Sequence, residues 1–452
     1  MPSDAGQNGR TIYLEATSTA NSDINTGIQR VVRNLAKNAP EVAAGIGIDV
    51  DLVIFDSVSL NRSNLSSLIE PAKQGDVNGI GLMALPHKLY KKLLWFISLL
   101  LPSKQARHFV RAPSSRVGLS WLFLFPFRKV RQHFHRLSAE GATLVLVDAS
   151  WEHPAIWAQV KDFKQRGGRV VGIVYDVIPM THPDLCADKL TAAFRQWLFS
   201  LLDVADGIVC ISAFSARCLQ DIIDERTQTG VLAHAPMVSH FYLGAELDLL
   251  RSDESPTTAV QEIFSRDNPV FLVVGSIDPR KNHGFILDAF ERFWQDEGQA
   301  TLLIIGAHGW KNEGFLDRVA NHPKTDKELF LLRSANDADL NFAYKNASAL
   351  VFASQIEGFG LPIVEAFQHG LPVICSDIPV FREIADGKAT FFDLSDPAHL
   401  ESAIAEHCRT HSMTDNADRA PQPYLSWKES TQQFFGEIEK MSKPAEHSYT
   451  IA

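Results

Sequence analysis

The segment EGFGLPIVE begins at Glu357, ends at Glu365 and directly follows a short apolar run. Gly358 and Gly360 allow the backbone to approach a ligand closely, and Pro362 suits the first turn of a helix. The amides at the start of such a helix point toward an anion, for example a diphosphate. The two carboxylates can accept hydrogen bonds from hydroxyl groups of the same ligand. On the residues alone, a plain strand-to-helix connection explains the segment about as well.

Two adjacent cations follow another apolar run. Arg280 and Lys281 come shortly after Gly275, in the segment VVGSIDPRKN. Guanidinium and ammonium groups bind phosphate oxygens and can offset the charge that grows on a leaving diphosphate. A solvated loop is the alternative interpretation. The position directly after a predicted strand favours a ligand-binding role, because open α/β sheets bind ligands at that end of their strands.

The first half of the chain offers weaker candidates. Tyr175 and Asp176 stand at the end of a predicted strand, and His182 follows as either a functional residue or an ordinary turn residue. Gly27 opens a predicted helix after the first strand, either as a phosphate-approaching turn or as a simple helix start. Ser212 is predicted to be the N-cap of another helix.

Short apolar runs alternate with amphipathic stretches along most of the chain, which is typical of βαβ units around parallel sheets. We expect strands at residues 11–16, 48–55, 143–147, 170–175 and 207–211, and then at 270–275, 301–305, 329–332, 349–352, 372–375 and 389–392. The pattern lapses around 231–244 and in the polar stretch 251–258, where we place the interdomain connection. The sequence therefore predicts an α/β protein with Rossmann-like domains over 1–245 and 246–422, and a terminal amphipathic helix and tail over 423–452.

Three segments, in this order, resemble the large retaining GT-B family of glycosyltransferases called group 1, or family 4. They are VVGSIDPRKN, EGFGLPIVE and LPVICSDIPVFRE, which ends at Glu383. The family includes sucrose synthases, glycogen synthases and many bacterial mannosyltransferases. The resemblance covers most of 270–394 and is thinner over the first domain. It implies two Rossmann-like domains facing across a cleft, with the C-terminal helix crossing back to the first domain.

The resemblance also implies a role for each matching position in the second domain. Arg280 and Lys281 would hold the donor diphosphate and act in catalysis, Glu365 would take the ribose hydroxyls, and Glu357 would contact the transferred sugar. The donor site would be completed by Gly358, Phe359, Gly360, Leu361, Gly275, Ser276 and, from the first domain, Gly27.

In the first domain the implied catalytic residue is Asp176, and Tyr175 and His182 are acceptor-side candidates. Many relatives carry His where this chain has Tyr175, so the chain departs from the family pattern at this position. The implied reaction is transfer with retention of configuration through an oxocarbenium-like state. It needs no metal and no cofactor beyond a nucleotide diphosphate sugar, for which GDP-mannose is the leading candidate. The implied acceptor is a glycan or a polyprenyl-linked glycan in O-antigen, capsule or exopolysaccharide synthesis.

Two other functions remain open on the sequence. A sugar-nucleotide epimerase or hydrolase could use the same fold, and the chain could be a non-catalytic subunit of a polysaccharide assembly complex. The retention of Arg280, Lys281, Glu357 and Glu365 speaks against the second of these.

Charge and composition define the expected surroundings. A net charge of −10 argues against general nucleic-acid binding, and five scattered cysteines with a polar N-terminus predict a cytoplasmic location. The interval 77–139 differs from the acidic chain as a whole in its charge, because it holds 11 Lys and Arg residues and no Asp or Glu. Its apolar stretches fall short of the roughly 20 residues that span a bilayer. We expect this interval to bind the inner face of an anionic membrane peripherally, with a helical lid or a dimer contact as the alternatives.

Overall fold

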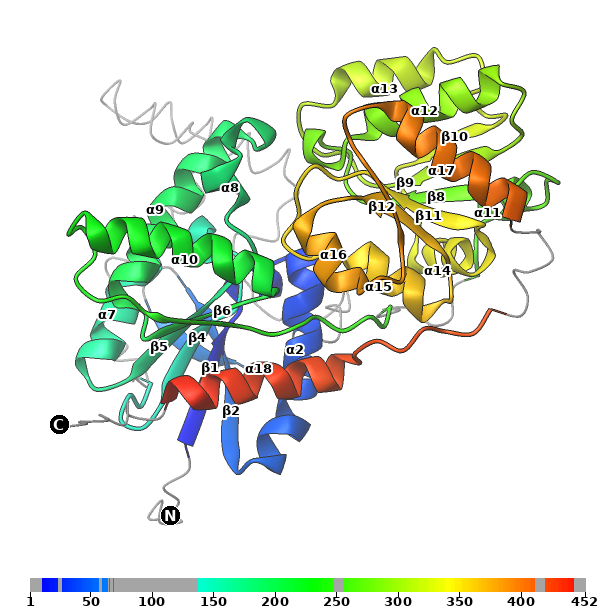
Figure 1. Cartoon of the computed structure of the whole chain (residues 1–452). Coiled ribbons are helices and arrows are strands. Elements are labelled where there is room, and N and C mark those ends of the chain that lie inside the picture. The colour runs from blue at the N-terminus through cyan, green and yellow to red at the C-terminus, as the bar shows by residue number, and fades with distance from the viewer. Residues whose placement is uncertain are drawn as a thin grey trace, which may run out of the picture. The chain divides into compact units, whose positions relative to one another are not determined.

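The structure is a computed structural model, and it describes residues 10–22, 27–56, 59–63, 65, 68, 137–247, 255–410 and 419–442. These residues form two α/β domains, each built on one sheet with helices on both faces (Figure 1). Almost all of the expected insertion at 77–139 lies outside the described residues. Its last three residues are described, and Leu137 and Ala139 are buried in the core of the first domain.

The first sheet has seven strands in the order β3-β2-β1-β4-β5-β6-β7, and all neighbours are parallel except β2 and β3. The strands are β1 Arg10–Glu15, β2 Ile48–Phe55, β3 Leu60–Ser63, β4 Thr143–Leu146, β5 Arg169–Val174, β6 Gly207–Cys210 and β7 Met237–His240. Chain order reverses between β1 and β4. The carboxyl ends of these strands therefore border the crevice where open α/β sheets bind ligands.

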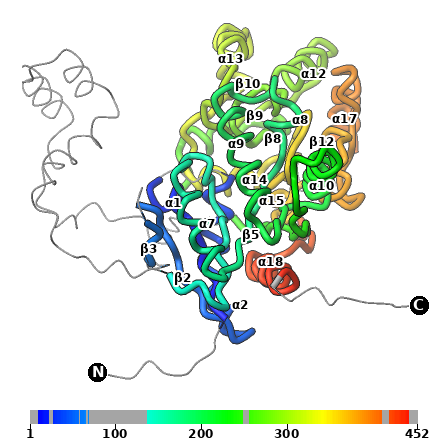
Figure 2. The backbone as a smooth tube through the Cα atoms, turned by 90° about the vertical axis from the view of Figure 1, so that its left-hand side faces the viewer, coloured from blue at the N-terminus to red at the C-terminus, as the bar shows by residue number. Residues whose placement is uncertain are grey.

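The helices of this domain cover both faces of the sheet (Figures 1 and 2). They are α1 Thr17–Ala20, α2 Gly27–Gly45, α7 Trp157–Gln165, α8 Ile178–Thr181, α9 Asp188–Val204 and α10 Ala213–Gln228. Ser212 is the N-cap of α10, and its hydroxyl accepts a hydrogen bond from the Ser215 amide at 3.0 Å. The prediction for Ser212 is confirmed.

The second sheet has six parallel strands in the order β10-β9-β8-β11-β12-β13. The strands are β8 Val270–Val274, β9 Thr301–Ile305, β10 Leu329–Leu332, β11 Ala349–Phe352, β12 Val373–Ser376 and β13 Thr390–Phe392. The helices are α11 Thr258–Phe264, α12 His283–Gln295, α13 Glu313–Ala320, α14 Asp337–Asn346, α15 Leu361–Gln368, α16 Pro379–Ala385 and α17 Pro397–Thr410.

The final helix, α18 Trp427–Ser442, packs on the first domain against α2, β6 and β7. Its Phe434 is fully buried, with its ring centroid 5.0 Å from that of Phe241 just after β7. A Cβ on Gly207 in β6 would lie 2.3 Å from the Met441 sulfur, so the helix lies directly on the sheet. The predicted return of the C-terminal helix to the first domain is confirmed.

Every strand expected from the sequence is present, with ends that differ by at most one residue. Two strands were missed. One of them is β7, Met237–His240, which lies inside 231–244. We expected connecting chain there, and for these four residues that prediction was wrong. This strand and β3 lie at the edges of the sheet, where partly exposed polar residues remove the apolar signal. Among the described residues, no helix is long and apolar enough to cross a membrane.

Candidate functional site

The basic pair lies on a short 3-10 helix, η5 Pro279–Lys281, just beyond the carboxyl end of β8. Asp278 caps this turn, because its Oδ1 accepts the Arg280 amide at 3.1 Å and its Oδ2 accepts the Ser276 hydroxyl at 2.7 Å. The Arg280 carbonyl accepts the Gln355 amide at 2.9 Å. This bond ties the loop that follows β8 to the loop that follows β11.

Both cations contact one carboxylate. Lys281 Nζ lies 2.6 Å from Glu357 Oε1, and Arg280 Nη1 lies 3.2 Å from Glu357 Oε2. The Lys281 ammonium also lies 4.5 Å from the ring centroid of Phe352, the last residue of β11. Burial would raise the pKa of Glu357, but Arg280 and Lys281 more than offset this and lower it. The carboxyl group is therefore ionised. Arg280 also pairs with Asp278, whose Oδ1 lies 3.7 Å from the Arg280 Nε.

The helix that follows Glu357 is α15, which begins at Leu361. Its N-cap, Gly360, has a φ of 110°, a backbone conformation that favours glycine, and Pro362 stands in the first turn. Gly275 at the end of β8 also has a positive φ, 147°, and a Cβ there would lie 3.3 Å from the Lys281 side chain. Two cations and a helix N-terminus together provide positive charge for an anion such as a diphosphate.

Glu365 makes different contacts from Glu357. Its Oε1 lies 2.6 Å from an Arg30 guanidinium nitrogen on α2 of the first domain, and its Oε2 accepts the Tyr344 hydroxyl at 2.6 Å. Burial lowers the pKa of Arg30, and the Glu365 carboxylate more than offsets this to raise it. The structure thus brings Arg280, Lys281 and Glu357 into one cluster, and it places Glu365 in an ion pair between the domains.

The loop between β11 and α15 contains Gly358 and Gly360 and is called the glycine turn below. It contacts the first domain at Gly358. Its carbonyl accepts the Ser212 hydroxyl at 2.7 Å and the Ser215 hydroxyl at 3.1 Å. A Cβ on Gly358 would lie 2.5 Å from the Tyr175 carbonyl oxygen and 3.0 Å from Asp176 Cβ. Glycine is required here because the backbone just after β5 comes this close. Ser212 is therefore both a helix cap and a contact between the domains.

A second contact between the domains involves Glu383 on α16. Its two carboxylate oxygens accept the amides of Ala213 at 2.7 Å and Phe214 at 2.8 Å, at the N-terminus of α10. An anionic side chain is favourable at a helix N-terminus, because the free amides and the helix dipole both attract it. The two domains are thus joined by specific polar contacts near the glycine turn.

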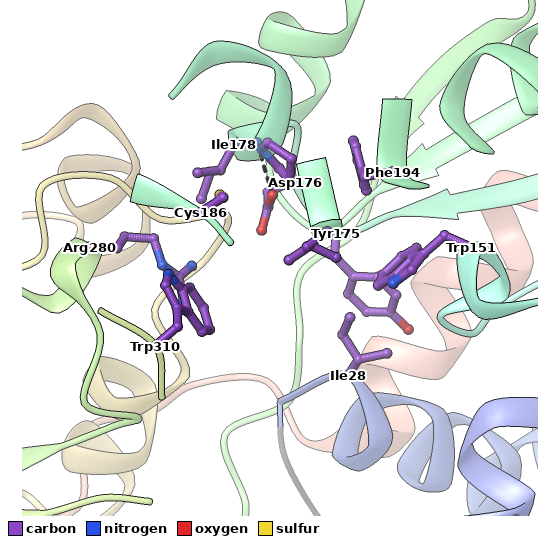
Figure 3. A pocket seen from close by; sticks show the side chains of 11 residues that line it. Ile28, Trp151, Tyr175, Asp176, Ile178, Cys186, Phe194, Arg280 and Trp310 are labelled. Carbon is purple, nitrogen blue, oxygen red and sulfur yellow. Dashed lines mark hydrogen bonds between the residues drawn. The ribbon is translucent and has the colours of Figure 1, made fainter. Parts of the chain in front are cut away.

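Asp176 lines a pocket together with Arg280 (Figure 3). Its Oδ1 accepts the Ile178 amide at 2.9 Å. Burial raises the pKa of Asp176, while Arg280 and this amide oppose the shift. Asp176 of the first domain therefore lies near the cluster of Arg280, Lys281 and Glu357. Its carboxylate can accept a hydrogen bond from a ligand in the pocket.

The remaining candidates differ in their relation to this site. The Tyr175 ring lines the pocket, but its hydroxyl donates to the Val147 carbonyl at 2.6 Å and is thus held inside the first domain. His182 is exposed, lies at the end of α8, pairs with the Thr181 hydroxyl and is not among the residues that line this pocket. Gly27 is exposed at the start of α2, with open space where a Cβ would lie.

Phe359 is buried and Leu361 opens α15, so both supply backbone at the helix start. Ser276 is engaged with Asp278. Within the described ranges, no group of three or more His, Cys, Asp or Glu side chains could hold a metal ion.

Sequence reasoning missed several residues that contribute to this region. Arg30 gave no local signal, because an arginine on an amphipathic helix is ordinarily exposed, whereas here it pairs with Glu365 of the second domain. Trp151 and Trp310, which line the pocket from the two domains, follow strands β4 and β9. Their position after strand ends was the available signal.

Two parallel α/β domains, a returning C-terminal helix and a cationic site at the strand ends of the second domain define the GT-B fold class. Residues 256–419 match the family described as glycosyl transferases group 1. The second domain of the chain is therefore similar to this family.

Several known proteins with similar sequences are named mannosyltransferases. The serotype-specific mannosyltransferase WbdA of Escherichia coli is 32% identical over 281 residues, which are 62% of this chain and 34% of that protein. The O-antigen chain mannosyltransferase B of Escherichia coli is 28% identical over 269 residues, which are 59% of this chain and 68% of that protein. The chain thus matches only about a third of the length of the WbdA relative.

Solved structures support the fold. The α,α-trehalose 6-phosphate synthase of Burkholderia multivorans superposes with a TM-score of 0.56 over 96% of this chain and 97% of that chain, at 12% identity. At this identity the likeness concerns the fold alone. The expected GT-B architecture is confirmed.

Proposed function

We propose that the chain is a retaining glycosyltransferase that transfers a hexose, with mannose the first candidate, from a nucleotide diphosphate sugar to a glycan acceptor. The observation that carries this proposal is the contact of Arg280 and Lys281 with Glu357 at the start of α15. A bound diphosphate would meet two cations and a helix N-terminus at the same place.

The chemistry follows from the charges of this cluster. As the glycosidic bond breaks, negative charge grows on the leaving diphosphate, and Arg280 and Lys281 stabilise it. Glu357 holds both side chains in position. Its carboxylate would also accept hydrogen bonds from the hydroxyls of the transferred sugar. The leaving diphosphate would take the acceptor proton on the same face, so no protein nucleophile is needed. Asp176 would accept a hydrogen bond from the acceptor hydroxyl.

Mannose is favoured because two relatives named mannosyltransferases match more than half of this chain. The name of one of them also places it in O-antigen chains. We therefore propose a polysaccharide acceptor, which could be carried on a polyprenyl lipid. The reaction needs no cofactor beyond the sugar nucleotide, so we expect EDTA to leave the rate unchanged.

The test is a donor panel. The purified chain is incubated with GDP-mannose, UDP-glucose, UDP-galactose or UDP-N-acetylglucosamine, and nucleotide release is measured with and without a mannose-terminated oligosaccharide. We expect acceptor-dependent release of GDP and an α-linked product by NMR. Release without any acceptor, or formation of a new sugar nucleotide, would instead support a hydrolase or an epimerase.

A non-catalytic subunit would bind nucleotide sugars without releasing nucleotide under any of these conditions. Glu357→Gln separates this alternative from an enzyme whose acceptor has not been found. If the chain is an enzyme, the variant reduces polysaccharide synthesis in cells that depend on this chain. Unchanged synthesis would favour the subunit.

We also propose that the interval 77–139 binds anionic lipid, on the evidence of its 11 basic and zero acidic residues. The test is flotation with vesicles of phosphatidylglycerol or of phosphatidylcholine. We expect binding only to the anionic vesicles and its loss in about 1 M salt, where the Debye length falls to about 3 Å. Replacement of Lys88, Lys91 and Lys92 by Gln should weaken binding, whereas the same change at Lys324, Lys327 and Lys345 should not. Equal binding to both vesicle types would contradict the proposal.

A further inference from the structure

A pocket of about 130 Å³ is lined by side chains of both domains (Figure 3). Trp151 and Phe194 of the first domain lie on one side of it, and Trp310 of the second domain lies on the other side beside Arg280. Asp176 lies between the two sides. The volume is close to the roughly 150 Å³ that accommodates one benzene ring in an engineered cavity. The pocket is therefore about the size of one unsubstituted six-membered ring, and the substituents of a larger ring would extend beyond it.

The wall on the side of the first domain is aromatic and held in place. The Trp151 ring packs edge-on against Phe194, with centroids 5.7 Å apart, and against Trp197, with centroids 5.3 Å apart. Such edge-to-face contacts fix the orientation of an aromatic ring. Trp151 is only partly buried, so part of its surface borders the pocket.

The opposite wall is fixed by the first domain. The Trp310 indole N–H donates to the Leu185 carbonyl at 2.9 Å, and the neighbouring Lys311 ammonium donates to the Cys186 carbonyl at 3.0 Å. Both carbonyls belong to the connection between α8 and α9 of the first domain. The pocket is therefore complete only when the loop after β9 contacts this connection.

The pocket also has a polar end. Asp176 uses Oδ1 to accept the Ile178 amide, and its Oδ2 has no protein partner within the described part of the chain. Arg280 lines the same pocket and belongs to the cluster proposed to hold the donor diphosphate. A ring bound here would thus have aromatic walls, a carboxylate acceptor for a hydroxyl donor, and the donor site as its neighbour.

We propose that this pocket binds one pyranose ring of the acceptor glycan, with Trp151 and Trp310 as its walls and Asp176 as the hydrogen-bond acceptor for a ring hydroxyl. The proposal rests on the proposed function, and it identifies the acceptor subsite. A pyranose has apolar faces of C–H groups and a rim of hydroxyls, which matches two aromatic walls and one carboxylate. Trp151 and Trp310 are therefore specificity-determining residues.

The main alternative occupant is an isoprenoid chain of a lipid carrier. An isoprenoid could use the aromatic walls, but it has no donor for Asp176. Burial of a carboxylate against hydrocarbon without a hydrogen-bond donor is unfavourable. The presence of Asp176 in the lining therefore favours a sugar.

The test uses saturation-transfer NMR with methyl α-D-mannopyranoside as the sugar probe and geranyl diphosphate as the isoprenoid probe. We expect transfer to the ring protons of the mannoside with the wild-type chain, and a roughly tenfold weaker affinity in Trp151→Ala and in Trp310→Ala. Trp157→Ala is the matched control, because Trp157 is a partly buried tryptophan of the first domain outside the pocket lining. It should retain the wild-type signal.

Three results would overturn the proposal. The first is no transfer to the mannoside with the wild-type chain. The second is wild-type transfer to the mannoside in both alanine variants. The third is transfer to geranyl diphosphate alone that depends on the two tryptophans. If Trp151→Ala does not fold, Trp151→Phe takes its place, and it should retain much of the signal because a ring remains. Failure of the proposed function is seen separately, as no nucleotide release from any sugar nucleotide. Mannoside binding that depends on both tryptophans would still support the pocket in that case.

Discussion

The Glu365 carboxylate of the second domain lies 2.6 Å from the guanidinium group of Arg30 in the first domain. The Arg30 side chain is 15% exposed and that of Glu365 is 2% exposed, so water screens this pair weakly. The Tyr344 hydroxyl satisfies the other carboxylate oxygen. The carboxylate expected to receive the ribose hydroxyls therefore also connects the two domains.

Removal of Arg30 should destabilise the chain strongly. Arg30→Ala leaves the Glu365 charge buried without its cation, which costs about 3–5 kcal/mol in comparable buried pairs. We expect this loss in the free energy of unfolding, measured by urea denaturation. Arg10→Ala is the control, because the Arg10–Glu439 pair is 3.8 Å long and largely exposed. Surface pairs of this kind contribute about 0–1 kcal/mol. Equal losses in the two variants would contradict a special role for the Arg30 pair.

Removal of Lys281 should reduce catalysis. Its ammonium group would stabilise charge on the leaving diphosphate, so Lys281→Ala should lower kcat about 10²–10³-fold, as when a donor to a developing anion is lost. Steady-state nucleotide release measures this loss. Lys324→Ala removes a lysine in a surface ion pair with Glu328 and should leave kcat unchanged. Equal kcat values for Lys281→Ala and the wild type would remove Lys281 from the mechanism.

The sheets could be predicted from the sequence because their central strands are buried on both faces. The strand Thr301–Ile305, for example, is buried at every position and reads as a continuous apolar run. The edge strand Met237–His240 is partly exposed and contains Ser and His, so no run marks it. Its place in the sheet depends on pairing with β6, which local sequence does not encode.

The candidate site could be predicted only where a local motif contains it. Arg280, Lys281 and Glu357 lie in two segments with recognisable spacing, and the structure brings them into contact. The Arg30 and Glu365 pair joins residues far apart in the chain. An arginine on an amphipathic helix is ordinarily exposed, and it is buried here because the second domain packs on α2. Such contacts form only when the two domains pack together. The sequence of a single segment does not indicate how the domains pack.

Gly358→Ala should impair the contact between the domains at the site. The added Cβ would lie 2.5 Å from the Tyr175 carbonyl oxygen, and backbone atoms cannot move aside cheaply. We expect kcat to fall at least about tenfold, because misplacement of about 1 Å can cost 10²-fold, while nucleotide affinity changes little. Gly314→Ala is the control, since that glycine lies in α13 with open space at its Cβ position. A Gly358→Ala variant with wild-type kcat would show that this close contact is not needed for turnover.

The Glu15 carboxyl group should make stability depend on pH. It is fully buried at the end of β1, where Oε2 accepts the Ser150 hydroxyl at 2.8 Å, and burial together with nearby Asp148 raises its pKa from 4.5 to about 7. Between these values the native state keeps a proton that the unfolded chain has lost. The free energy of unfolding therefore falls as pH rises through this window, by roughly 3 kcal/mol for the shift of this one group.

Glu15→Gln removes the titration and keeps the shape of the side chain. Urea denaturation at several pH values between 4.5 and 7 should show the variant gaining stability relative to wild type as pH rises. A difference that stays constant with pH would mean that Glu15 is ionised in the native state throughout this range.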